Sequence, residues 1–139
     1  MYKLNKILVP IDGSKKSFEA LDRAVTLAAF THGEITCIHV IPYIMKGGPR
    51  LRVIDEQIIS EGNVILKKAS KHVGNKNVRF KTKIIRGSPS YEIIKLSQSG
   101  KFDHIVMSTT GSGAANGEML GSVSNYVLHK SKIPVYLIK

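Results

Sequence analysis

The sequence is poor in the residues that staple small extracellular proteins or build metal clusters. It contains one cysteine, Cys37, and no tryptophan. A single thiol allows neither an intrachain disulfide nor a thiolate metal cluster, and the lack of a disulfide framework fits a reducing compartment. Cys37 lies within the apolar run 35–41, where nothing nearby in the sequence would lower its pKa. We therefore expect a buried, inert thiol.

Long hydrophobic runs are also missing. No segment approaches the roughly 18 consecutive apolar residues that a membrane-spanning helix needs. The apolar stretch near the N-terminus is too short for the core of a signal peptide, and Asp12 follows it directly. We expect a soluble, cytoplasmic protein with no membrane among its partners.

Acidic residues are scarce, with 10 Asp and Glu against 21 Lys and Arg and a formal net charge of +11. Such an excess can indicate a polyanionic partner. Here the basic residues form separate small groups, for example Lys15-Lys16 and Lys67-Lys68, without interleaved aromatic side chains that could stack on bases. A solvated basic surface explains them better, and nucleic acid is not an expected partner.

What the sequence does contain is an ordinary globular balance in 139 residues, 42% apolar and 22% charged, which suits one domain over 1–139. Short apolar runs typical of strands lie at 5–11, 34–41, 77–85, 103–108 and 133–138. Apolar residues three and four positions apart predict helices over 15–31, 51–73, 90–99 and 121–130. Ser14 should cap the first helix, and Gly33 should end it in the left-handed conformation.

The alternation of strands and helices predicts an α/β fold with a parallel sheet covered by helices on both faces. The alternating polarity of 77–85 favours an edge strand. Right-handed crossovers leave few topologies. The natural one is a doubly wound five-stranded sheet of order 3-2-1-4-5, like flavodoxin or the adenine-nucleotide alpha-hydrolase-like folds. Ligands of such sheets bind beyond the carboxyl ends of the strands, where we expect 10–12, 39–41 and 107–123 to meet.

The segment 107–123 is rich in glycine and small polar residues. Gly111 and Gly113 would let a ligand approach the backbone closely. Gly121-Ser122 would begin a helix whose free N–H groups suit a phosphate. A mobile surface loop with an ordinary helix cap explains the same composition equally well. Established fingerprints do not fit, because there is no P-loop and the glycine spacing misses the dinucleotide pattern by one residue.

No arrangement of side chains in the sequence suggests catalysis or metal binding. The histidines form no pair at metal-ligand spacing with one another or with Cys37. A Gly-x-Ser-x-Gly motif is absent, and no carboxylate pair stands out for acid–base work. We predict no catalytic and no metal-binding residue. We interpret His39 and His104 as strand residues that pack or form hydrogen bonds.

Taken together, the motifs of the whole chain resemble the universal stress protein family. They are Ile-Leu-Val-Pro-Ile-Asp-Gly-Ser at 7–14, Ile-His-Val at 38–40, and the segments 86–94, 102–107, 121–128 and 133–138. ATP-binding members of the family carry Gly-x2-Gly-x9-Gly-Ser/Thr. Gly111 and Gly121-Ser122 match its second and third elements, whereas Ser108 replaces the first glycine and Ser112 stands where many relatives have a basic residue.

The resemblance implies a site for ATP or another adenine nucleotide, with or without Mg²⁺. Its residues would be Pro10, Ile11 and Asp12 along the adenosine, Val40 against adenine, Met107 and Ser108 beside base and ribose, and Gly111, Gly121, Ser122 and Val123 around the phosphates. Asp12 would lie near the ribose hydroxyls or the metal-bound phosphates. From the residues alone, an ordinary turn residue is the favoured interpretation of Asp12, and core packing is the safer interpretation of Val40 and Met107.

The resemblance also implies a homodimer that pairs through Ile133 to Ile138 and a regulatory role in a stress response. Nucleotide occupancy would then switch the dimer surface toward a protein partner. The alternative is a nucleotide-independent dimeric interaction protein of the same family, which Ser108 favours. Because neither a general base nor a nucleophile is evident, we expect at most slow ATP hydrolysis.

Overall fold

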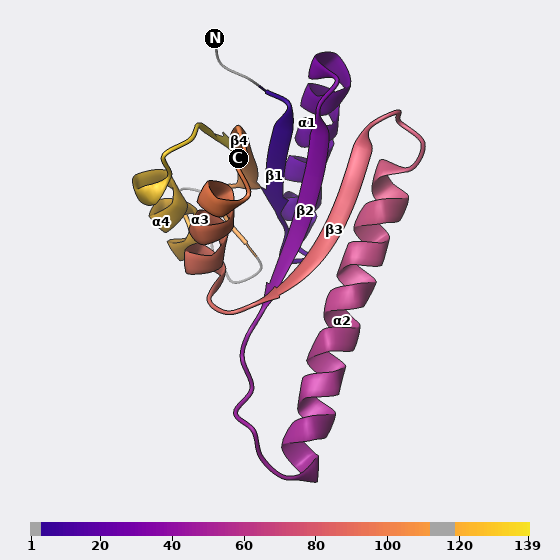
Figure 1. The fold of residues 1–139 in the computed structure, drawn as a ribbon, viewed down its shortest axis with the longest axis vertical. Helices are drawn as coiled ribbons and strands as arrows, with labels where there is room; N and C mark the ends of the chain where they lie inside the picture. Colours follow the sequence, from indigo (N-terminus) through magenta and orange to yellow (C-terminus); the bar gives the residue numbers. More distant parts are fainter. Residues whose placement is uncertain (1–3, 112–118) are drawn as a thin grey trace.

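Five parallel strands form one sheet whose order reverses at its first strand. The computed structural model describes residues 4–111 and 119–139. Its strands are β1 (Lys6–Pro10), β2 (Glu34–Ile41), β3 (Arg79–Arg86), β4 (His104–Ser108) and β5 (Val135–Ile138). They lie in the order β3-β2-β1-β4-β5 (Figure 1). The predicted order 3-2-1-4-5 is confirmed, and β3 is an edge strand as its alternating polarity indicated.

Helices cover both faces of this sheet. They are α1 (Lys15–Thr31), α2 (Pro49–Val73), α3 (Pro89–Ser99) and α4 (Ser122–Lys130). One core cluster joins α1 and α2 to Ile7 and Val9 of β1. The other joins α3 and α4 to Leu8. Because successive side chains of a strand point to opposite faces, a strand covered on both sides must be apolar throughout, which is the pattern of 7–9.

The end of α1 corrects one prediction. Ser14 caps the helix as expected, its Oγ accepting from the N–H of Ser17 at 3.2 Å. The left-handed residue at the other end is His32 (φ 57°), not Gly33. Gly33 is needed for space, since a Cβ there would lie 2.9 Å from the carbonyl oxygen of Leu4. A glycine after a helix can therefore mark close chain packing rather than a positive φ.

Most elements begin or end one or two residues away from the predicted boundaries. The larger shifts lie at the starts of the second helix, the third strand and the fifth strand, the last of which begins at Val135 rather than residue 133. The second helix begins at Pro49 rather than residue 51, with the proline in its first turn. The third strand begins at Arg79 rather than residue 77, because Asn77 adopts a left-handed conformation (φ 56°) that no strand accommodates. These differences lie at connections between elements, where local backbone geometry decides the boundary.

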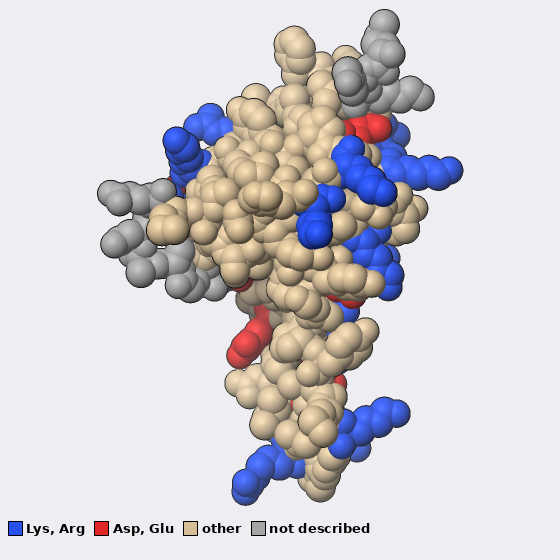
Figure 2. Space-filling model, turned by 90° about the vertical axis from the view of Figure 1, so that its left-hand side faces the viewer, with Lys and Arg blue, Asp and Glu red and all other residues tan. Residues whose placement is uncertain are grey.

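The first half of α2 projects past the sheet (Figure 1). The buried residues of this helix begin only at Gly62. Asp55 ties the projecting half to the end of β3 through two hydrogen bonds from Arg86, of 2.7 and 3.0 Å. Figure 2 shows Lys and Arg in separate groups on one face, including one at the projecting end. This distribution agrees with a solvated basic surface.

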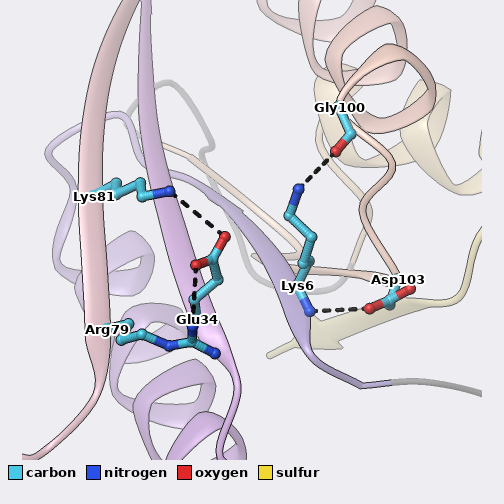
Figure 3. A network of polar contacts seen from close by, with 6 residues as sticks. All are labelled: Lys6, Glu34, Arg79, Lys81, Gly100 and Asp103. Carbon is cyan, nitrogen blue, oxygen red and sulfur yellow. Dashed lines mark hydrogen bonds and ion pairs between the residues drawn. The ribbon is translucent and has the colours of Figure 1, made fainter.

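Polar contacts fix the register at the amino-terminal edge of the sheet (Figure 3). The carboxylate of Asp103 accepts from the backbone N–H of Lys6 at 3.0 Å, which joins the start of β4 to β1. The Lys6 side chain donates to the carbonyl of Gly100 at 3.1 Å. Glu34, with a side chain only 15% exposed, pairs with Arg79 and Lys81 of β3. None of these residues lines the cavity that opens at the carboxyl edge of the sheet.

Two further expectations concern burial. Cys37 is fully buried in β2, and burial raises the pKa of its thiol to about 12. The reactive thiolate is therefore scarce at neutral pH, as expected of an inert packing residue. Within residues 4–111 and 119–139, no helix combines the length and apolarity needed to cross a membrane.

Candidate functional site

A cavity of about 400 Å³ opens at the carboxyl ends of β1, β2 and β4. Its volume lies within the range of small-molecule sites. It sits where the chain turns from one half of the sheet to the other, the usual ligand position in doubly wound folds. Every site residue singled out in the sequence lines it, namely Pro10, Ile11, Asp12, Val40, Met107, Ser108, Gly111, Gly121, Ser122 and Val123.

Sequence reasoning missed part of the wall. The cavity is also lined by Ser17, Ile38, His39, Pro89, Ile93, Thr110 and Ser124. His39 had been interpreted as a packing or hydrogen-bonding residue, and it does form such a bond. Ser17 and Ser124 lie three residues after the N-caps Ser14 and Gly121, one turn into helices that begin at the carboxyl edge. This spacing in the sequence could have identified them as residues near the cavity.

Two hydrogen bonds from β2 hold the end of β1 in the cavity wall. The N–H of Ile11 donates to the carbonyl of Ile38 at 2.8 Å, and Nδ1 of His39 lies 2.8 Å from the carbonyl oxygen of Ile11. Because a carbonyl only accepts, Nδ1 carries the proton. Asp12 Oδ1 accepts from the N–H of Ser14 at 2.9 Å, so this carboxylate forms the turn into α1 while also lining the cavity.

The segment after β4 is shaped by Ser108, the last residue of that strand. Its hydroxyl donates to the carbonyl of Thr110 at 2.7 Å, and the residue is 8% exposed. The Ser108 side chain is thus turned to the backbone and stabilises the turn. A Cβ at Gly111 would overlap Oδ2 of Asp12, so a side chain at this position would displace the carboxylate from its place in the cavity wall. Ser112 and Gly113 lie outside the described residues.

The start of α4 is fastened to the end of β4. The carbonyl of Thr109 accepts from the N–H of Gly121 at 2.8 Å and from the hydroxyl of Ser124. Gly121 is the N-cap, and no side chain of the described residues caps the helix. Because residues 121–124 line the cavity, the first free N–H groups of α4 lie at its wall. Such a helix end favours negative charge.

The remaining wall combines apolar surface with hydroxyls already engaged. Ile11, Val40 and Met107 contribute apolar surface on which a flat ring can pack. The Ser17 hydroxyl donates to the carbonyl of Ser14 at 2.8 Å, so it is bonded to backbone like those of Ser108 and Ser124. No group of three or more His, Cys, Asp or Glu among the described residues could hold a metal ion. The arrangement is suited to binding a ligand with an apolar ring and an anionic group.

Sequence comparison supports one family over the whole chain. The model of the universal stress protein family matches residues 3–139. A universal stress protein of Methanocaldococcus jannaschii is 33% identical over 143 residues, covering 100% of this chain and 83% of that protein. Universal stress protein YxiE of Bacillus subtilis is 32% identical over 97% of this chain and 99% of its own length.

Solved structures share the fold. The universal stress protein UspA from Lactobacillus plantarum superposes with a TM-score of 0.87 at 23% identity, with 100% of both chains covered. A universal stress protein in complex with cAMP gives a TM-score of 0.77 at 23% identity, over 97% of each chain. One from Archaeoglobus fulgidus in complex with dAMP gives 0.71 at 19% identity, with both chains fully covered. From the match over residues 3–139, this chain belongs to the universal stress protein family.

Proposed function

We propose that this protein binds an adenine nucleotide in the cavity at the carboxyl edge and acts as a dimeric regulatory protein in a stress response. One observation carries the proposal: residues from four separate segments, each singled out for this role, line a single cavity. Two relatives of the same fold are complexes with cAMP and dAMP. The single free cysteine suits the reducing cytoplasm as its location.

The cavity wall offers a place for each part of such a ligand. Adenine would pack on Val40 and Met107, and the ribose hydroxyls would face Asp12. The first N–H groups of α4, at Ser122 and Val123, would hold a phosphate. Asp12 is the only carboxylate among the described lining residues. A Mg²⁺ ion would therefore be held jointly by this residue and the nucleotide, and it would supply neutralisation of phosphate charge.

Titration tests the proposal directly. The protein is stripped of nucleotide and titrated by calorimetry with AMP, ADP and ATP, each with and without Mg²⁺, and with GMP as the control for base recognition. We expect one adenine nucleotide to bind per chain in the micromolar range and GMP to bind more weakly. If no adenine nucleotide binds, the nucleotide-independent interaction protein becomes the better description of this chain.

The two edges of the sheet differ in their capacity to pair with a second copy. The edge strand β3 presents exposed Arg79, Lys81 and Lys83, charges of the kind that discourage edge-to-edge pairing. The other edge, β5, reads Val-Tyr-Leu-Ile and carries no charge. We propose that the segment from Ile133 to Ile138 forms the homodimer contact, and that the dimer surface binds a further protein partner.

Backbone hydrogen bonds connect the edge strand β5 to the cavity wall. The N–H of Thr109 donates to the carbonyl of Ile138 at 2.9 Å, and the carbonyl of Thr109 holds the N–H of Gly121. One residue therefore contacts both the edge strand and the helix start that lines the cavity. Because a coupling free energy is reciprocal, nucleotide binding should tighten the dimer as much as the dimer tightens nucleotide binding.

The substitution Val135→Pro is expected to make the protein monomeric. The carbonyls of Pro134 and Ile138 accept from β4, so in a parallel ladder the intervening odd residues direct their N–H groups to the open edge. Proline at position 135 removes one of these outward donors. Light scattering during gel filtration would measure the mass.

Thr82→Pro on β3 is the control at the other edge. The N–H of Gly87 donates to the carbonyl of Ile41, so the even residues of β3 direct their N–H groups outward. A dimer that survives Val135→Pro would place the contact elsewhere.

A further inference from the structure

We propose that the cavity selects adenine ligands of low phosphate charge, adenosine or a monophosphate, over the triphosphate. The inference rests on the proposed nucleotide-binding function and narrows its ligand class. Its basis is the charge of the wall, which differs in sign from that of the protein as a whole.

The described wall contains one carboxylate, Asp12, and neither lysine nor arginine. The chain carries 21 Lys and Arg in total, so their absence from this wall is not a consequence of composition. The described lining residues that would surround the phosphates are therefore neutral or acidic.

The positive ends of helices remain as the source of attraction for phosphate. The first turn of α4 lines the cavity, and α1 and α3 reach it at Ser17 and Pro89. A helix N-terminus acts as about half a positive charge, and its effect falls off within the first turn. A terminal phosphate carries about two negative charges at neutral pH. One phosphate at Ser122 and Val123 is thus partly balanced, whereas each further phosphate adds a full charge for which the described wall offers no lysine or arginine, and approaches the carboxylate of Asp12.

Lys15 and Lys16 are the nearest basic residues along the chain, directly after the turn formed by Asp12. Neither lines the cavity, and Lys15 is exposed. Charges in water beyond the cavity mouth are screened over about 8 Å at physiological ionic strength. These two lysines therefore attract every anionic nucleotide to the protein, but they neutralise little of the charge on individual phosphates inside the cavity.

Two variants alter the wall charge and keep the hydrogen bond that forms the turn into α1. Asp12→Asn keeps the side-chain oxygen that accepts from the N–H of Ser14 but removes the negative charge. Ser122→Lys adds a cation at an exposed residue of the wall, and the Ser122 side chain caps nothing among the described residues. If charge sets selectivity, both variants should favour ATP relative to AMP.

The test compares adenosine, AMP and ATP by calorimetry in EDTA at pH 8 and 150 mM salt. We expect AMP to bind wild-type protein at least about tenfold more tightly than ATP, a difference of about 1.4 kcal/mol, and each variant to reduce this ratio. ATP binding as tightly as AMP overturns the inference, as does a ratio that neither variant changes, because ligand size would then explain it. Absence of binding by all three ligands overturns the proposed function itself.

Discussion

Gly121→Val is expected to weaken nucleotide binding strongly while leaving the protein folded. Residue 121 is an extended N-cap (φ −65°, ψ 164°), a conformation open to valine. A Cβ there would meet the carbonyl oxygen of Thr109 at 3.5 Å and Oγ of Ser124 at 3.7 Å, both ordinary contacts. Stability therefore gives no reason for glycine at this position. The reason we infer is space, because a side chain here occupies the wall that a phosphate would approach.

The chain provides a matched control for this variant. Gly48 is also an extended N-cap glycine (φ −62°, ψ −172°) without a side-chain cap, and a Cβ there would meet nothing within 4 Å. It begins α2 and does not line the cavity. In calorimetric titrations with AMP, we expect Gly121→Val to weaken binding roughly a hundredfold, about 2.7 kcal/mol, and Gly48→Val to leave it unchanged.

Thermal denaturation separates the two possible causes of lost binding. Both variants should melt within a few degrees of the wild type, since neither substitution meets a backbone clash. If Gly121→Val binds AMP normally, the ligand lies elsewhere and the assignment of residues 121–123 is wrong. A large drop in the melting temperature of Gly121→Val alone would instead show that the helix start needs glycine for folding.

The fold was predictable because strands buried on both faces of the sheet appear in the sequence as continuous apolar runs. The runs around Ile7 and Ile105 are apolar throughout, and the intervening helices show apolar positions three and four apart. What remained hidden were single-residue backbone conformations. Histidine and asparagine adopt the left-handed conformation more often than most residues, but the sequence did not show that His32 and Asn77 in particular would do so.

The candidate site was predictable in its backbone and less so in its wall. Glycine positions and strand ends identified where a ligand could approach, and the cavity is there. The other lining side chains come from elements that only the packing of the fold brings to this edge. Ile93 of α3 is an example, because it belongs to a core cluster and also lines the cavity. Ser108 lines the cavity and its hydroxyl bonds to the carbonyl of Thr110, a contact that the sequence alone does not show.

The largest expected loss of stability follows from Ile105→Ala. Ile105 is fully buried at the centre of β4, where it pairs with Leu8 of β1 and Val135 of β5. Its core cluster includes Ile38 and Ile93. Replacing a buried isoleucine by alanine costs about 2–5 kcal/mol, depending on how far the surroundings collapse into the space.

The position of Ile105 favours the upper part of that range, about 4 kcal/mol. Backbone ladders on both sides fix the spacing of β4 from its neighbours, so only α3 and α4 can move inward. Urea denaturation should show a lower midpoint with an unchanged slope. Ile105→Val should cost about 0.5–1.5 kcal/mol, and Val64→Ala, at a half-exposed residue of α2, less than about 0.5 kcal/mol. A loss below about 1 kcal/mol for Ile105→Ala would mean that α3 and α4 move into the space left by the side chain. Since Ile93 of α3 lines the cavity proposed to bind a nucleotide, such movement should weaken AMP binding in the same variant.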